Sequence, residues 1–160
     1  MEIKYKQPKL KDSLYGEMFW QNFDEDMETT WFARIENVPN ERFEVLIEAE
    51  SPLDFMAVRN THSMYKKLLA DLPLIRQKTI DFILENIDEW AENRTERKTL
   101  RERLNQPLKL SSITIYEDLS SSIEFSEEDY ENLPFDEIQD NLYAAISSDG
   151  EFLEAGVSEL

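Results

Sequence analysis

The chain has 160 residues, a length typical of one domain, and carries 35 Asp and Glu against 17 Lys and Arg, a net charge of −18. This charge repels nucleic acid, whose binding depends on Lys and Arg, so DNA or RNA binding is not expected. The chain has no cysteine, which excludes disulfides, thiol nucleophiles and cysteine metal ligands. Hydrophobic residues form 41% of the chain, enough for a folded core.

The sequence also predicts where the protein resides. No apolar run approaches the roughly 20 residues that a membrane span needs. Residues 1–6 lack the apolar core of a signal peptide. We therefore expect a cytoplasmic protein that is not inserted in a membrane.

The first third of the chain predicts strands. Residues 14–19 and 29–35 are rich in apolar, aromatic and β-branched side chains, and the polar residues 21–26 between them predict a loop. Residues 37–40 form a turn signal. Phe43, Val45 and Ile47 recur at every second position, which favours a strand buried mainly on one face. We expect these strands to form an antiparallel meander.

The middle of the chain predicts helices. Ser51 is a candidate N-cap with Pro52 in the first turn, and apolar residues then recur at three- and four-residue spacing over residues 55–69. Leu72-Pro73 indicates a break, after which residues 80–91 carry a broad apolar stripe. The charged residues 93–103 predict a short exposed helix that contains five of the basic residues.

The last third predicts a second set of strands over residues 108–115, 122–126, 142–147 and 152–157, with residues 127–140 mainly in a loop. Asp149-Gly150 predicts a tight turn with positive backbone angles. The predicted fold is α+β, a single domain over residues 1–160, in which antiparallel strands from both chain ends pack against two central α-helices.

Few residues suggest catalysis. The chain has three glycines and no glycine-rich phosphate loop. The single histidine, His62, lies on an apolar stripe, and we interpret it as structural rather than as a catalytic base. Asp24-Glu25-Asp26 is either a solvated acidic loop, which we favour, or a site for a hard cation, although its spacing is not that of an EF-hand. We predict no catalytic residue, metal or cofactor, and a hydrolase that uses carboxylates and a divalent cation is the alternative.

Aromatic residues gather early in the chain, at Trp20, Phe23, Trp31 and Phe32. Alternation places Trp31 and Phe32 on opposite faces of one strand, so that one of them is a candidate for exposure. Core packing is the favoured interpretation, and an interface anchor is the other. A structural protein that associates with itself is therefore a further alternative, and the oligomeric state stays open.

The charge is distributed unevenly. Residues 1–109 hold all 17 basic residues against 21 acidic ones, whereas residues 110–160 hold 14 acidic residues and no basic one. The acidic third is either a solvated face or a docking surface for a basic protein. For the docking surface, the sequence predicts carboxylates with Tyr130 or Phe135 as apolar anchors. The predicted carboxylates are Glu124, Glu127, Glu128, Asp129, Glu131, Asp136 and Glu137.

Several segments of the chain resemble a known family. They are Phe82-x7-Trp90, the segment LKLSSITIYED at residues 108–118, Ile123-Glu124-Phe125 and Asp149-Gly150-Glu151. Together they are similar to a family of uncharacterised bacterial domains, domain of unknown function twenty-two sixty-two, whose members look like immunity proteins of polymorphic toxin systems. That family tends to carry a Gly-His pair before the last hairpin, which residues 135–142 lack.

The resemblance supplies no catalytic residue, and it implies an immunity function of the toxin–antitoxin kind. Combined with the charge, it predicts an acidic immunity-type inhibitor that occludes a basic toxin sterically and electrostatically.

Overall fold

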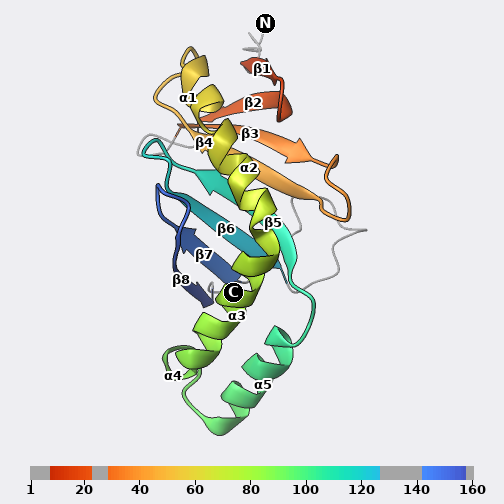
Figure 1. Cartoon of the computed structure of the whole chain (residues 1–160), viewed down its shortest axis with the longest axis vertical. Coiled ribbons are helices and arrows are strands. Elements are labelled where there is room, and N and C mark those ends of the chain that lie inside the picture. Colours follow the sequence, from red (N-terminus) through yellow and green to blue (C-terminus); the bar gives the residue numbers. More distant parts are fainter. Residues whose placement is uncertain (1–7, 23–28, 127–141, 158–160) are drawn as a thin grey trace, which may run out of the picture.

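A computed structural model describes residues 8–22, 29–126 and 142–157 of the chain. In these ranges the chain forms an eight-stranded sheet, and the order of the strands in space is their order in the sequence (Figure 1). The strands are β1 (Lys9–Asp12), β2 (Gly16–Asn22), β3 (Thr29–Ile35), β4 (Phe43–Glu48), β5 (Lys109–Ile115), β6 (Ser121–Ser126), β7 (Leu142–Ile146) and β8 (Phe152–Val157).

Two four-stranded antiparallel meanders make up the sheet, and they join where β4 pairs with β5 in parallel. A parallel pair needs a long crossover, and here the crossover is helical. Its helices are α1 (Phe55–Asn60), α2 (His62–Ala70), α3 (Leu72–Glu85), α4 (Ile87–Trp90) and α5 (Arg94–Leu104).

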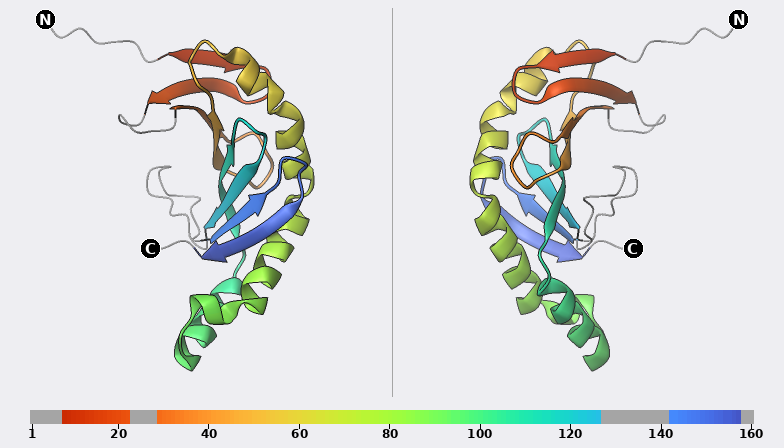
Figure 2. Two further views of the ribbon diagram at one scale, coloured as in Figure 1. Left: turned by 90° about the vertical axis from the view of Figure 1, so that its left-hand side faces the viewer. Right: turned by 90° about the vertical axis from the view of Figure 1, so that its right-hand side faces the viewer.

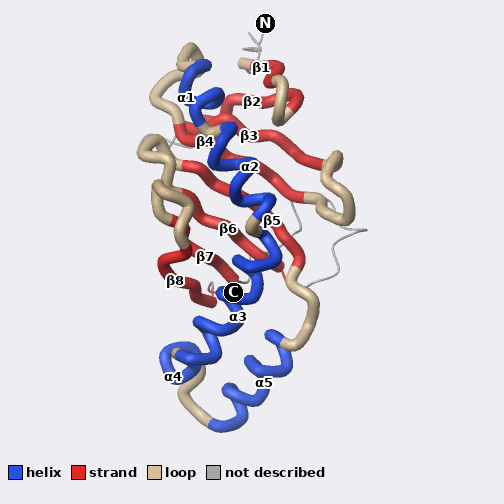
Figure 3. The backbone as a smooth tube through the Cα atoms, in the orientation of Figure 1, coloured by secondary structure: helices blue, strands red, loops and turns tan. Residues whose placement is uncertain are grey.

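The helices α1, α2 and α3 follow one another as a bent rod along one face of the sheet (Figures 1 and 2). Single residues separate them, Thr61 between α1 and α2 and Asp71 between α2 and α3. Pro73 lies in the first turn of α3, where the missing N–H costs no helical hydrogen bond. Beyond α3, α4 and α5 extend past the end of the sheet (Figure 3).

The core lies between this helical rod and the sheet. Alternate residues of the strands point toward the rod, including Trp31, Phe43 and Phe125, which are at most 1% exposed. From the rod, Leu68 and Ile83 enter the same cluster. The apolar residues that recur at every second position in the strands therefore pack against those that recur with a period of 3.6 in the helices, and together they form one apolar layer.

The other face of the sheet carries a more polar set of side chains, and none of the described helices covers it (Figure 2). Phe19 and Phe32 are cross-strand neighbours there, with ring centroids 5.5 Å apart. Arg34 Nε lies 3.8 Å from Glu44 Oε1 in the adjacent pair of strands. Trp31 is thus the core residue and Phe32 its half-buried neighbour on the opposite face.

Gly156 lies close to the ring of Tyr143 on this face, and a substitution can test this contact. Tyr143 lies opposite it across β7 and β8, and a Cβ at Gly156 would come within 2.6 Å of the tyrosine ring. We expect Gly156→Ala to lower the free energy of unfolding by about 1–3 kcal/mol, since the ring must move. In a Tyr143→Ala background the same change should be nearly neutral, as urea unfolding will show. An equal loss in both backgrounds would contradict this explanation.

The structure confirms the α+β class and corrects several finer predictions. Strand β1 was not predicted, and Gln21 and Asn22 belong to β2 rather than to a loop. The strands are not all antiparallel, because β4 and β5 are parallel. Instead of two central helices, the crossover contains three in a row and then α4 and α5, since Thr61 and Asn86 interrupt the two predicted segments.

The helix caps and turns also differ in detail from those predicted from the sequence. The side chain of Asp54, not of Ser51, caps α1, because its Oδ1 accepts a hydrogen bond from the Ala57 N–H at 3.1 Å. The β7–β8 hairpin is confirmed. Within its predicted turn Asp149-Gly150, however, Gly150 has a positive φ, of 83°, and Asp149 does not. Its turn is closed by the Ser147 N–H, which donates to the Glu151 carbonyl at 2.8 Å. No helix among the described residues has the length and apolar character to cross a membrane.

Candidate functional site

The most strongly charged hollow among the described pockets lies where β4 ends, α1 begins and β5 turns into β6. It has a volume of about 320 Å³ and four carboxylates in its lining. No Lys, Arg or His lines it within the described part of the chain. We call it the acidic pocket, and its residues are Glu48, Glu50, Asp54, Ala57, Asn60, Tyr116, Glu117 and Leu119.

The parallel pairing of β4 and β5 creates this pocket. Because parallel strands end at the same edge of a sheet, the chain leaves β4 at Glu48 beside the residues that follow β5. The Glu117 N–H donates to Glu48 Oε1 at 3.3 Å, which joins the two strand ends across 69 positions of sequence. A compact turn after β5 follows, in which Leu119 has a φ of 68° and the Asp118 carboxylate accepts from the Ser120 N–H at 2.9 Å.

The carboxylates of the pocket influence one another. Partial loss of hydration and then repulsion from Glu50, Glu48 and Asp54 raise the pKa of Glu117. Like charges held together favour the protonated form of one of them or the approach of a cation. No cluster of three or more His, Asp or Glu among the described residues has the arrangement of a metal site.

An apolar ridge adjoins the acidic pocket at the start of α1. Leu53, Phe55 and Met56 are 79%, 51% and 56% exposed, and they lie within four consecutive positions. Single exposed apolar residues are common on protein surfaces, but contiguous large ones mark interaction sites. The ridge consists of Leu53, Phe55 and Met56.

A second hollow of about 330 Å³ lies against Phe55 and Met56 and contains His62 at its wall. Nε2 of His62 is 2.9 Å from each carboxylate oxygen of Asp12, and the Asp12 Oδ2 also accepts from the Tyr15 N–H at 2.8 Å. The contact ties the β1–β2 hairpin to α2. His62 is therefore partly buried, as predicted, and its structural role stays a prediction.

Two buried tyrosines support the same junction. The Tyr15 hydroxyl lies 2.7 Å from Thr61 Oγ1, and its ring meets His62 and Tyr65 edge to face. Burial raises the pKa of Tyr15 well above its usual range and raises the pKa of Tyr65 to about 12. Both phenols are thus neutral at physiological pH and act as packing groups of the α1–α2 end.

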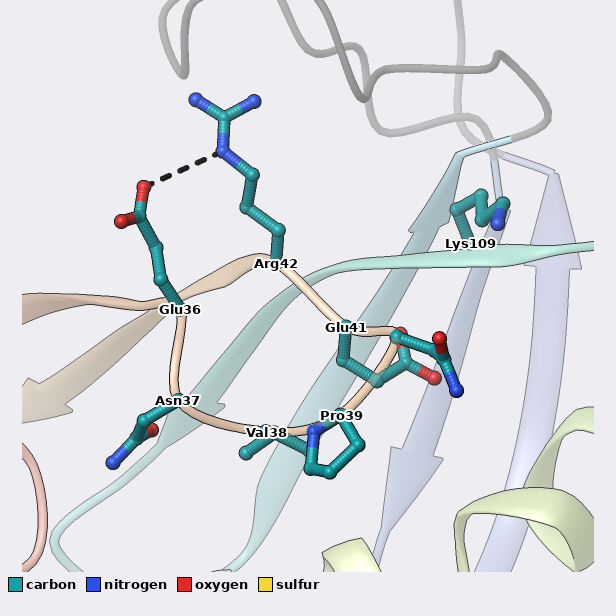
Figure 4. Close-up of a pocket in the computed structure, with 8 residues that line it drawn as sticks. Glu36, Asn37, Val38, Pro39, Glu41, Arg42 and Lys109 are labelled. Carbon is teal, nitrogen blue, oxygen red and sulfur yellow. Dashed lines mark ion pairs between the residues drawn. The ribbon is translucent and has the colours of Figure 1, made fainter.

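A third hollow, of about 340 Å³, lies under the β3–β4 turn and is shown in Figure 4. Glu36 pairs with Arg42 at 3.6 Å, and Glu41 forms an ion pair with Arg76 of α3. Lys109 of β5 completes the lining. The charges of this turn therefore neutralise one another largely within the chain, in contrast to those of the acidic pocket.

The docking residues predicted from the sequence fall almost wholly outside the described residues. Of that set only Glu124 is described, half-buried on β6 opposite Ser112 and Tyr143. The predicted anchors Tyr130 and Phe135, with their neighbouring carboxylates, lie within residues 127–141, and Asp24-Glu25-Asp26 lies within residues 23–28. These predictions remain untested.

The sequence reasoning missed the acidic pocket, which combines residues from three separate segments. Each carboxylate is ordinary in its local context, and only the cluster of Glu48, Glu50 and Asp54 around one turn signals unusual charge density. The adjoining Phe55 belongs to the apolar spacing predicted for a buried helix face, but it is exposed, and Val58 is the buried residue of α1.

No family model, curated protein or solved structure matches this chain. The resemblance to the uncharacterised bacterial family therefore stays a prediction.

Proposed function

We propose that this chain is a protein-binding module that holds a basic segment of a partner protein in its acidic pocket, with the apolar ridge as anchor. One observation carries the proposal: four carboxylates surround a hollow that no basic side chain of the described residues lines, next to three large exposed apolar residues. Charges of one sign speed the encounter with a partner of opposite charge, whereas a desolvated apolar anchor supplies affinity.

The test uses a peptide of alternating lysine and leucine, with a glutamate-for-lysine peptide as the opposite-charge control. We expect the basic peptide to bind in calorimetry, and to bind more weakly as NaCl rises from about 50 to about 500 mM because salt screens exposed charges. The variant Glu48→Gln/Glu50→Gln/Glu117→Gln should weaken binding about tenfold, a difference of about 1.4 kcal/mol.

A matched variant separates the pocket from the general negative charge of the chain. Glu85→Gln/Glu89→Gln/Glu151→Gln removes the same number of exposed carboxylates outside the acidic pocket. It should leave the affinity for the basic peptide within about twofold, since additional distant charges are screened. If both triple variants weaken binding equally, or if the acidic peptide binds as well as the basic one, the pocket is not the site.

The most specific form of the proposal is an immunity-type inhibitor that occludes a basic toxin. It is supported by the net charge of −18 and by the family resemblance. Co-expression with a basic toxin domain encoded beside this chain should protect cells, and the pocket variant should protect less. Peptide binding without such protection would support the proposed binding module and contradict the immunity role.

A further inference from the structure

Helix α5 presents a line of positive charge on this acidic protein. Arg94, Lys98 and Arg101 follow at spacings of four and three residues, which places them on one side of the helix, and all three are exposed. Within the described part of the chain none of the three forms an ion pair, whereas Arg97 Nε lies 2.9 Å from Asp88 Oδ1. We call Arg94, Lys98 and Arg101 the basic stripe.

The basic stripe is held in place at a cost to the helix. Like charges at these spacings repel one another and destabilise a helix. Leu100 and Leu104, each 4% exposed, anchor an adjoining side of α5 in the apolar core, and the Asn93 side chain caps its start by accepting from the Glu96 N–H at 2.9 Å. The fold thus fixes three mutually repelling cations toward solvent, where an anionic surface would relieve the repulsion.

Three kinds of anionic surface could bind the basic stripe: a lipid membrane, a nucleic acid and an acidic protein. A lipid membrane is disfavoured, because a membrane-surface helix needs an exposed apolar face and the leucines of α5 are buried. Nucleic acid is disfavoured because the whole chain has a charge of −18 and would be repelled. An acidic patch on a folded protein is the remaining kind of anionic surface. Two acidic proteins also repel each other, but salt screens that long-range repulsion, whereas the attraction between opposite charges in contact is screened less.

We infer that the basic stripe docks on the acidic pocket of a second copy of this chain. The two surfaces are complementary in charge, and α1 and α5 lie at opposite ends of the long axis (Figure 1). An antiparallel two-fold dimer therefore brings each basic stripe to the other copy's acidic pocket and forms two identical contacts in a closed assembly. The inference rests on the same pocket as the proposed function, and it makes the dimer and the basic partner competitors for that pocket.

The test is a charge exchange followed by sedimentation velocity and light scattering. The full chain should dimerise at about 50 mM NaCl and dissociate at about 500 mM, because the Debye length falls with salt. Arg94→Glu/Lys98→Glu/Arg101→Glu should raise the dimer dissociation constant at least about tenfold, and so should Glu48→Lys/Glu50→Lys/Glu117→Lys. An equimolar mixture of the two variants should dimerise again. One contact then pairs the acidic stripe of the first variant with the basic pocket of the second, and the other contact keeps the original charges.

A matched control excludes a general effect of charge. Lys11→Glu/Lys66→Glu/Lys78→Glu changes the net charge by the same amount at exposed sites outside the basic stripe, and it should dimerise like the original chain. The inference is overturned if the original chain is monomeric at low salt, if the control variant dissociates equally, or if the mixture stays monomeric. Basic-peptide binding by a monomeric chain would overturn the dimer alone, whereas a stripe-dependent dimer that ignores the peptide would overturn the proposed function alone.

Discussion

Replacement of Phe125 by alanine is expected to lower the free energy of unfolding by about 3–5 kcal/mol, one of the largest effects of a single change in this protein. Phe125 is fully buried on β6, and its cross-strand neighbours Leu110 and Leu142 are fully buried as well. Since Phe125 belongs to the layer between the sheet and the helical rod, the vacated volume cannot fill with water and the lost contacts are not replaced.

Urea unfolding followed by tryptophan fluorescence measures this effect, and Phe55→Ala is the matched control. Phe55 is 51% exposed at the start of α1, so that its truncation should change stability by less than about 0.5 kcal/mol. Similar losses for Phe125→Ala and Phe55→Ala would show that the central layer is not the stabilising core.

Replacement of Arg76 by methionine is expected to have the second large effect, lowering the free energy of unfolding by about 2–4 kcal/mol. Arg76 of α3 pairs with Glu41 of the β3–β4 turn, and their side chains are only 25% and 11% exposed. The guanidinium also lies 6.0 Å from the centre of the Phe125 ring. Without Arg76, the Glu41 carboxylate is left nearly buried without its ion-pair partner, and its lost hydration is less well compensated.

The double variant Glu41→Gln/Arg76→Met tests this cause. Neither Glu41 Oε2 nor Arg76 Nε has a hydrogen-bond partner in the structure that the described residues form, so the pair is incompletely satisfied. Removal of both charges should therefore recover more than half of the stability that Arg76→Met loses, as measured by the same urea titration. A double variant as unstable as Arg76→Met would show that lost packing, and not the stranded carboxylate, causes the loss.

The local part of the fold was accessible from the sequence. Strand β4 lies where alternation predicts it, since the strand buries one face and its apolar residues must recur at every second position. Strand β3 lies where its β-branched and aromatic residues predict it. The charged segment before Pro107 forms α5, with the exposure expected of it. Strand β1 was missed because its four residues, Lys9–Asp12, carry too little apolar pattern to distinguish an edge strand from a loop.

The candidate site depends on contacts that no local pattern encodes. A run of helical residues indicates a crossover, but it does not specify that β4 and β5 pair in parallel, because the alternation of each strand fits either direction. That pairing brings Glu117 to Glu48 and places both beside the start of α1. The acidic pocket is thus a product of strand order rather than of any one segment.

The sequence by itself determined the strand and helix content, the apolar faces and the strongly acidic character, because these follow from periodicity and composition within short windows. Only the tertiary structure decided which carboxylates share a pocket, and that α1 and α5 lie at opposite ends of the molecule (Figure 1). The physical reason is that side-chain charges interact through space, at distances set by the packing of segments far apart in the chain.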